Sequence, residues 1–394
     1  MARREAPAAG PGSRALVVDV IRSAGAISRV ELAEVTGLTQ PSISNIVRDL
    51  IAEGVIHETG SIDSVRGKPR KLISINPASR FGVGFHLGPD TMTCVAIDLT
   101  GGVVGREVVP RIPGDDALAA GLADRFDAFT AGLDLPTSRI EGLAIVAPTA
   151  VPGRPTEPAE TGDVRAQVAD RIGLPVIAEN DAAAAALGEF WSRRVSREQS
   201  FGCVYLSAGI GAGFVFHGAL FRGASFNAGE LGHLSIDFDG RECPCGNRGC
   251  VERYASMTAV VEAAHADPTL RGILPPDATT TAGTYDVLAR AAVNGDPAAF
   301  AVLDRAAAQL SVAVTSVVNL LDLGRLVLTG PGVALAGSIY ARRVRAHLDR
   351  TAHARHRHGI VVELSAQPRD AAAIGAAALV VQAAVAPGHY GPES

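Results

Sequence analysis

The spacing of apolar residues divides the chain into two regions of different character. Residues 14–76 show apolar positions at helical spacing and then two short strand-like runs, whereas residues 81–385 alternate short apolar runs with longer helical segments. The turn-forming sequence at 76–79 separates the two regions and indicates a domain boundary. Residues 1–13 and 386–394 lack such a pattern and are expected to be tails. The chain is therefore expected to hold a small first domain and a large α/β domain.

The first region carries start and stop signals for three short helices. Gly25 ends the first helix, Ser28–Glu31 forms a capping box at the start of the second, and the third runs over Thr39–Gly54. Two strands are expected at residues 55–58 and 72–75, with a polar loop between them. Three helices with a tight second turn, followed by a two-stranded wing, form a winged helix-turn-helix, which places a helix in the major groove of DNA.

The third helix and the wing carry the residue types that contact DNA. One side of the helix is apolar, and the other presents polar residues that can bond base edges: Gln40, Ser42, Ser44, Asn45 and Arg48. The wing adds four basic residues with no acidic residue among them: Arg66, Lys68, Arg70 and Lys71. A helical bundle with a solvated basic loop would share part of this pattern, but the basic wing favours DNA binding. Because the formal net charge is −5, contact with double-stranded DNA depends on this local patch.

The second region predicts strands and helices in alternation. A hairpin is expected at residues 92–109. Short buried strands are expected at 143–146, 176–178, 203–207 and 326–328, and helices at 181–191 and 297–321. No short repeat is visible, although an array of this length can hold two related lobes. No stretch approaches the roughly 20 uninterrupted apolar residues of a membrane span, so no membrane association is expected.

One segment offers four side chains that commonly bind zinc: His233, Cys243, Cys245 and Cys250. Gly246 and Gly249 allow the chain to curl tightly enough to return the last thiolate to the metal. Because protein would fill all four positions of a tetrahedral Zn²⁺, the metal is expected to be structural. The alternative is a set of inert buried thiols, which is how we interpret Cys94 and Cys203 in their apolar strands. Five cysteines, three of them within eight positions, favour a metal site in a reducing cytosol over a disulfide framework.

Two longer motifs resemble the ROK family, which comprises repressors and sugar kinases. The first is Ala228–His233 followed by Cys-x-Cys-Gly-x-x-Gly-Cys-x-Glu at Cys243–Glu252, and the second is Glu179–Ala182 followed by an alanine-rich helix. The resemblance covers nearly the whole chain, because the repressors of this family carry a winged helix before the kinase-like domain. It implies an α/β, hexokinase/actin-like fold of two lobes with a cleft between them.

The resemblance also implies a sugar pocket in that cleft. Its lining would be Asn180, Glu230, His233 and Glu252, with Asp181 as the base that faces the hydroxyl phosphorylated in a kinase. Carboxylates and an amide supply hydrogen-bond partners for sugar hydroxyls, and a metal-bound His233 keeps a second ring nitrogen for the same purpose. Asn180 and Asp181 also fit a helix cap, since either residue type after a strand is a common N-cap. Beside the metal loop, we favour the pocket.

The chain departs from the kinases of this family at the first phosphate loop. Those kinases have an acidic residue followed by Gly-Gly-Thr, whereas here His86 stands at the acidic position and Pro89 and Asp90 interrupt the glycines. Proline removes a backbone donor, and Asp90 would bring negative charge near a triphosphate. The second glycine loop, at 207–213, lacks the expected threonine at Ala208. Its glycines alone are weak evidence for nucleotide binding, because they also allow tight packing of strands.

Three functions fit these features. A transcription regulator, a repressor of carbohydrate-related genes controlled by a sugar effector, would use both the winged helix and the pocket without being an enzyme. An ATP-dependent sugar kinase would use Asp181, and a third alternative is a DNA-binding protein whose second domain only dimerises. The altered phosphate loop favours the regulator over the kinase, and the retained Asn180, Glu230 and Glu252 argue against a domain that senses nothing. A homodimer or homotetramer is expected, since two-fold symmetry lets two heads read a pseudo-palindrome.

Overall fold

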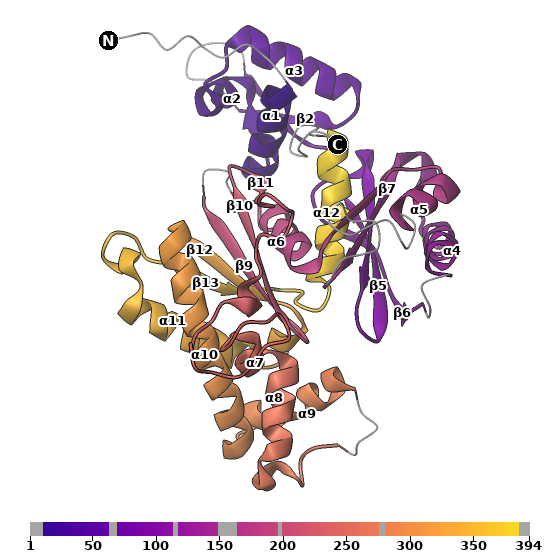
Figure 1. The fold of residues 1–394 in the computed structure, drawn as a ribbon. Coiled ribbons are helices and arrows are strands. Elements are labelled where there is room, and N and C mark those ends of the chain that lie inside the picture. Colours follow the sequence, from indigo (N-terminus) through magenta and orange to yellow (C-terminus); the bar gives the residue numbers. More distant parts are fainter. Residues whose placement is uncertain are drawn as a thin grey trace.

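A small head domain sits on a body of two lobes in the computed structural model of this chain (Figure 1). The structure describes residues 11–62, 69–112, 117–148, 164–195, 199–275 and 280–385. The head contains α1 (Pro11–Ala24), β1 (Ile27–Ser28), α2 (Arg29–Thr36), α3 (Gln40–Ala52), β2 (Ile56–Ile62) and β3 (Arg70–Ile75). Strand β3 lies between β1 and β2 in an antiparallel sheet. The predicted winged helix-turn-helix is therefore confirmed.

Local sequence signals set the ends of the head helices. In the capping box predicted for α2, Ser28 Oγ accepts from the Glu31 N–H at 3.3 Å, and the Glu31 carboxylate accepts from the Ser28 N–H at 2.9 Å. Gly37 ends α2 in the left-handed conformation, with φ 69°, and Thr39 caps α3. Helix α1 begins at Pro11, inside the expected tail, because proline fits the first turn of a helix. Strand β1 was not predicted, since its two residues are extended through pairing with β3.

Each lobe of the body is built on a five-stranded sheet. The first sheet contains β4 (Phe81–Leu87), β5 (Thr91–Asp98), β6 (Val103–Pro110), β7 (Ile140–Ala147) and β8 (Val176–Asn180). The second contains β9 (Phe201–Leu206), β10 (Ile210–Phe216), β11 (Ala219–Leu220), β12 (Arg325–Thr329) and β13 (Val361–Leu364). The strand orders are β6-β5-β4-β7-β8 and β11-β10-β9-β12-β13, each an antiparallel meander extended by two parallel strands. The shared order shows two related lobes, as expected for a hexokinase/actin-like fold.

Helices cover both sheets and contribute much of the core. The first sheet is covered by α4 (Leu118–Ala131) and α5 (Val164–Ile172). The second lobe carries α7 (Glu252–Ala255), α8 (Met257–Ala266), α9 (Thr281–Val293), α10 (Pro297–Leu321) and α11 (Gly337–Thr351). Short 3₁₀ turns are η1 (Pro77–Ser79), η2 (Thr137–Arg139), η3 (Leu231–His233), η4 (Pro268–Leu270), η5 (Pro331–Val333) and η6 (His353–His356). Helix α10 coincides with the helix predicted at 297–321.

Among the described residues, α10 is the one helix with the length and apolar composition of a membrane span. Its apolar side is used inside the protein, because Leu303, Leu310 and Val314 are buried in the core of the second lobe. Asp304 of the same helix forms an ion pair with Arg343 of α11. These contacts make α10 a core helix of the second lobe.

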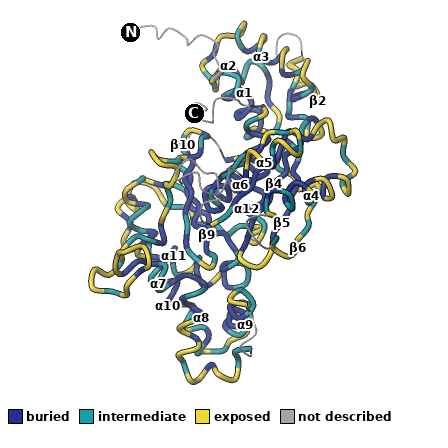
Figure 2. The backbone as a smooth tube through the Cα atoms, turned by 45° about the vertical axis from the view of Figure 1, so that its right-hand side comes forward, coloured by how far each residue is buried: buried dark blue, intermediate teal, exposed yellow. Residues whose placement is uncertain are grey.

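Two helices between the sheets hold the lobes together: α6 (Asp181–Ser192) and α12 (Ala371–Val385). A Cβ at Gly375 would overlap the Ala184 carbonyl group, so glycine lets the two helices touch backbone to backbone. In the same way, Gly84 brings β4 onto α12, and Gly213 brings β10 onto α6. Figure 2 shows both helices buried over most of their length.

The head rests on the ends of these two helices (Figure 1). Val17 and Ile21 of α1 share one hydrophobic cluster with Trp191, near the end of α6, and Val385, the last residue of α12. Arg14 of α1 also donates to the Val385 carbonyl oxygen at 3.3 Å. The head is thus packed directly on the central helices of the body.

Candidate functional site

The structure brings the four predicted metal ligands together. One ligand atom from each of His233, Cys243, Cys245 and Cys250 lies within 4.8 Å of the others. Cys243 Sγ is 3.6 Å from His233 Nδ1, and Cys245 Sγ is 3.7 Å from Cys250 Sγ. A tetrahedral Zn²⁺ with Zn–S bonds of about 2.3 Å and Zn–N bonds of about 2.0–2.1 Å requires edges of about 3.8 and about 3.6 Å. The cluster could therefore hold a metal ion, and these two distances match edges of such a tetrahedron.

Glycines shape the loop that carries these ligands. Gly246 and Gly249 have positive φ angles of 90° and 68°. A Cβ at Gly249 would overlap the Asp237 carbonyl group, so this crossing of the chain requires glycine. A backbone hydrogen bond from Asn247 lowers the pKa of the Cys245 thiol to about 7. The thiolate, which is the form that binds metal, is therefore accessible near neutral pH.

The other two cysteines are core residues, as predicted. Cys94 in β5 and Cys203 in β9 are fully buried. Burial raises the pKa of the Cys94 thiol to about 12 and that of Cys203 well above 9.0. Both thiols therefore stay protonated and unreactive at neutral pH.

Asn180 and Asp181 form the junction between β8 and α6. The Asn180 side-chain oxygen accepts from the N–H groups of Ala182 and Ala183 at 2.9 and 3.1 Å, so Asn180 is the N-cap of α6. Its side-chain nitrogen donates to the Pro148 carbonyl oxygen at 3.3 Å. Asp181 is buried, and its Oδ1 accepts from the Ala182 N–H at 2.7 Å. The helix-cap interpretation is therefore correct for Asn180, and it leaves Asp181 Oδ2 outside the cap.

Glu252 and the metal loop meet the start of α6 at the first residues of β10. Glu252 Oε2 accepts from the Ile210 N–H at 3.0 Å. A Cβ at Gly232 would lie 2.9 Å from the same carboxylate oxygen, so the metal loop passes directly beside it. A Cβ at Gly211 would lie 2.5 Å from the Ala182 Cβ, which places β10 against the first turn of α6. The start of β10 therefore brings α6, Glu252 and the metal loop side by side.

The remaining members of the predicted sugar set, Glu230 and His233, lie at the two ends of η3. His233 Nδ1 faces the metal cluster, which leaves Nε2 directed away from it. Glu230 is exposed, and its side chain makes no capping hydrogen bond. The structure thus gathers Asp181, His233 and Glu252 in one region, with Glu230 on its solvent side. Their joint contact with a sugar stays a prediction.

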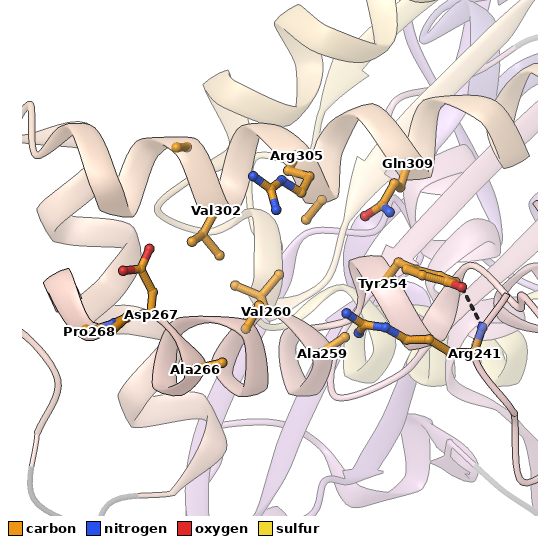
Figure 3. Close-up of a pocket in the computed structure, with 13 residues that line it drawn as sticks. Arg241, Tyr254, Ala259, Val260, Ala266, Asp267, Pro268, Val302, Arg305 and Gln309 are labelled. Atoms are coloured by element: carbon orange, nitrogen blue, oxygen red, sulfur yellow. Dashed lines mark hydrogen bonds between the residues drawn. The ribbon is translucent and has the colours of Figure 1, made fainter. Parts of the chain in front are cut away.

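A cavity of about 380 Å³ lies between α8 and α10, with Arg241 and Tyr254 from the neighbourhood of the metal loop at one end (Figure 3). Ala259, Val260 and Ala266 of α8 line one side, and Val302, Arg305 and Gln309 of α10 line the other. Tyr254 Oη accepts from the Arg241 N–H at 2.7 Å. Among the described residues, none of those predicted to bind metal, sugar or DNA lines this cavity, so we do not assign it to the site.

A larger cavity, of about 610 Å³, separates the two lobes. Its first-lobe wall contains His86 and the loop at 88–91, which is the altered phosphate loop. Its second-lobe wall contains Tyr205 and residues 207–208 of the second glycine loop. The two loops that would hold a nucleotide in a kinase therefore face each other across this cavity.

Helix α3 presents its predicted polar face to solvent. Four of the predicted DNA-binding residues are exposed: Gln40, Ser44, Asn45 and Arg48. Ser42 is half-buried, and its hydroxyl bonds with that of Thr39 at 2.9 Å, so it belongs to the cap of the helix. Arg48 donates to Asn45 Oδ1, one turn earlier on the same face. The exposed face could therefore present an amide and a guanidinium together.

The described part of the wing contains an ion pair that the sequence did not indicate. Arg66 and Lys68 lie outside the described residues. Arg70 is exposed at the start of β3. Lys71 pairs with Glu58 on the neighbouring strand, and its hydrogen bond lowers the pKa of that carboxyl group. The positive charge of Lys71 is thus partly neutralised within the head.

Comparison with known proteins identifies both parts of the chain. The ROK family model matches residues 83–383. The chain belongs to the ROK family. A model described as winged helix-turn-helix DNA-binding matches residues 17–57, within the head of this ROK protein.

Its relatives include regulators and kinases. The xylose repressor of Bacillus subtilis (strain 168) is 30% identical over 248 residues, which are 60% of this chain and 63% of that protein, so the match spans less than two thirds of the repressor. A ROK family transcriptional regulator, a homologue of the Escherichia coli MLC protein, has a crystal structure with 26% identity and a TM-score of 0.73, covering 95% of this chain and 96% of that one. A ROK family glucokinase from Streptomyces griseus, in complex with glucose and AMPPNP, has 25% identity and a TM-score of 0.65, covering 76% of this chain and 98% of that one.

Two contacts near the start of α6 in this ROK protein were missed from the sequence. His86 Nε2 lies 3.5 Å from Asp181 Oδ2, with the two side chains 12% and 5% exposed. Glu179 accepts from Arg222 Nε at 2.8 Å, and both side chains are largely buried. Each contact joins residues distant in sequence, so spacing carries no signal for it. The unusual residue at position 86 was itself a signal that its environment differs from that in a kinase.

Close packing explains why glycine occupies positions that, in a kinase, would belong to phosphate-binding loops. Gly211 and Gly213 lie where side chains would press on Ala182 and Ala186 of α6. Gly332 lies against the side chain of Leu206 in the same way. Packing therefore accounts for Gly211 and Gly213 of the second glycine loop, as the sequence allowed, and these glycines carry no argument for a nucleotide.

Proposed function

We propose that this ROK protein is a transcriptional repressor whose DNA binding is controlled by a sugar or a sugar derivative. The observation that carries the proposal is the likeness to a ROK transcriptional regulator over nearly the whole of both chains, head included. The relative named xylose repressor supports it. The proposal assigns binding of double-stranded DNA to residues 14–76 and sensing to residues 81–385, in a cytoplasmic protein.

The proposed effector site is the region where α6, β10 and the metal loop meet. Its members are Asn180, Asp181, Glu230, His233 and Glu252. The carboxylates accept hydrogen bonds from sugar hydroxyls, and His233 Nε2 adds a second kind of polar partner. A structural Zn²⁺ on His233, Cys243, Cys245 and Cys250 would fix the imidazole ring through Nδ1 and leave Nε2 for the sugar. These hydrogen-bonding side chains suit a polyhydroxylated ligand better than an apolar one.

We propose that this region binds its ligand without phosphorylating it. His86 contacts Asp181, which would act as the base in a kinase. Asp90 lies at the cavity where phosphates would sit, and one like-charge contact at about 4 Å with an effective dielectric of about 20 costs about 4 kcal/mol. The second candidate function is an ATP-dependent sugar kinase, which the retained Asp181 and the likeness to a glucokinase favour.

DNA is read by a homodimer or homotetramer in this proposal. One winged helix offers few base contacts, whereas two heads related by two-fold symmetry read both halves of a pseudo-palindrome. A change in the angle between the lobes would then alter the spacing of the two heads. The sugar shifts this equilibrium by the difference between its affinities for the two arrangements.

Operator binding with and without sugar tests the proposal. A duplex operator is first selected from random sequence with the full chain, and binding is then followed by fluorescence anisotropy. The ligand panel holds D-xylose, D-glucose and N-acetyl-D-glucosamine, with their phosphates. We expect at least one ligand to change the operator Kd of the wild type by about 5- to 150-fold, the usual range of allosteric coupling.

Variants locate the effector site in the same assay. Asp181→Asn and Glu230→Gln are expected to bind the operator as the wild type does and to lose the response to sugar. Glu262→Gln, a matched change at an exposed position of α8, is expected to keep it. A panel that leaves the wild-type Kd unchanged contradicts sugar control. Responses of wild-type size in both site variants contradict the assignment of this region.

A further inference from the structure

The DNA-binding head is anchored to the body by a buried arginine. Arg22, in the last turn of α1, donates from Nη1 to the Trp191 carbonyl oxygen at 2.9 Å and from Nη2 to that of Val195 at 3.3 Å. Trp191 lies in the last turn of α6, whose C-terminal end carries partial negative charge, and Val195 lies in the segment that follows the helix. A side chain of the head therefore binds the C-terminal end of the helix whose first residues belong to the proposed effector site.

The surroundings of Arg22 hold it in one geometry. The residue is 3% exposed, and its guanidinium carbon lies 4.7 Å from the ring centroid of Trp191 and 5.1 Å from that of Phe190. Asp19, one turn earlier on α1, lies 4.0 Å away. Burial lowers the pKa of Arg22 to about 10, which leaves the guanidinium charged at neutral pH. A planar cation bonded to two carbonyl groups and stacked on aromatic rings fixes the orientation of α1 on α6.

Helix α6 joins this contact to the effector region as a rigid element. It has 12 residues, which correspond to a length of about 18 Å. The whole stretch from Asp181 to Trp191 is buried, and α6 packs backbone to backbone on α12 at Gly375. A displacement at the first turn of α6 is therefore carried to its last turn, where the head is attached.

We propose that Arg22 is the positioning residue that couples sugar binding at the start of α6 to the orientation of the DNA-binding head. The inference rests on the proposed function, which supplies sugar binding as the signal. It adds the Arg22 contact as the path from the sugar site to the head. When α6 moves, Arg22 moves the head with it. In a dimer this changes the spacing of the two α3 helices, and with it the affinity for the operator.

The chain offers a built-in probe of this contact. Trp191 is its single tryptophan, so intrinsic emission reports on the ring beneath Arg22. We expect operator DNA to shift the Trp191 emission of the full-length wild type. Whichever of D-xylose, D-glucose and N-acetyl-D-glucosamine changes operator affinity should shift this emission as well.

Two substitutions of Arg22 separate coupling from folding. Arg22→Met removes the charge and the donors, and Arg22→Lys keeps the charge but cannot bond both carbonyl groups with a planar fork. We expect Arg22→Met to bind sugar as the wild type does, while the ratio of operator Kd values with and without sugar falls to within about twofold of one. Arg22→Lys should give an intermediate ratio. Arg125→Met, which removes an arginine from α4, is the matched control and should keep the wild-type ratio.

The outcomes distinguish this inference from the proposed function. If Arg22→Met keeps the wild-type ratio, Arg22 is not the coupling residue, although sugar control stands. If no sugar alters the wild-type operator Kd, sugar control fails, and the coupling role of Arg22 fails with it. A DNA-induced emission shift of equal size in wild type and Arg22→Met overturns the inference, whereas a shift reduced in the Arg22 variants and kept in Arg125→Met supports it. Should thermal unfolding show that Arg22→Met does not fold, Arg22→Lys serves the same comparison.

Discussion

His86 contacts Asp181, because His86 Nε2 lies 3.5 Å from Asp181 Oδ2. Asp181 Oδ1 accepts from the Ala182 N–H at the start of α6. Both carboxylate oxygens thus face partners from the protein, and His86 lies beside the oxygen that the helix cap leaves available to a substrate. Pro89 and Asp90, on the loop after β4, further remove a backbone donor and add negative charge beside the interlobe cavity.

From this arrangement we expect neither ATP hydrolysis nor sugar phosphorylation. The measurement is a coupled assay over hexoses, pentoses and amino sugars, with the Streptomyces griseus glucokinase as the positive control. Turnover should lie far below the range of about 1–100 per second that is typical of kinases. Turnover within that range would favour the kinase and contradict the repressor without enzymatic activity.

The metal cluster predicts about one zinc ion per chain, because four ligands would complete its tetrahedral coordination. Cys245→Ser is expected to lose the metal and to destabilise the loop that precedes Glu252. Cys94→Ala removes a thiol outside the cluster and should keep the zinc. Elemental analysis of the purified proteins measures the metal, and thermal unfolding with and without a chelator measures its contribution. Metal-free wild type of unchanged stability would show that the thiols do not form a structural site.

Recognition helix and wing should respond differently to substitution. Replacing Arg66, Lys68 or Arg70 with Ala is expected to weaken binding to all DNA sequences and to reduce the slope of log K against log salt by about one unit each. Gln40→Ala and Asn45→Ala should instead change sequence preference, because their side chains lie on the exposed face of α3.

Titrations of selected and random duplexes at several salt concentrations measure both effects. Arg125→Ala, on α4 of the body, serves as the control with an unchanged slope. Equal losses on selected and random DNA in the α3 variants would mean that this helix does not read bases.

Local features of the fold were accessible from sequence because they depend on neighbours along the chain. The capping box of α2 spans four positions, and the start of α10 follows from Asp296 and Pro297. The metal ligands were found because three of them lie in one short loop. The spacing of residues also identified α3 and its polar face, since a helix repeats every 3.6 residues.

Contacts between distant segments were not accessible in this way. Arg22 and Trp191 are 169 positions apart, and nothing in either segment indicates that a head arginine ends beneath the last turn of α6. The pairing of Lys71 with Glu58 depends on the register of β2 and β3, which a bulge after Glu58 shifts. These contacts arise from packing of whole elements, and packing is decided by the complete fold.

The capping box gives a prediction for the stability of the head. Ser28→Ala removes the hydroxyl that accepts from the Glu31 N–H and is expected to destabilise α2 by about 1 kcal/mol. Amide hydrogen exchange within α2 measures the loss. Ser138→Ala, at an exposed position of η2 outside the head, is the control and should leave this exchange unchanged.

The same pair makes part of this stability depend on pH. The Ser28 N–H and hydroxyl both donate to the Glu31 carboxylate and lower its pKa below 4.5. Because the folded pKa is lower than the unfolded one, the stabilisation is fully present above pH 4.5 and is lost as the pH falls through the folded value. The difference in α2 exchange between wild type and Ser28→Ala should therefore narrow below pH 4.5. A difference that stays constant down to about pH 3 would show that the ionised Glu31 carboxylate contributes nothing to this cap.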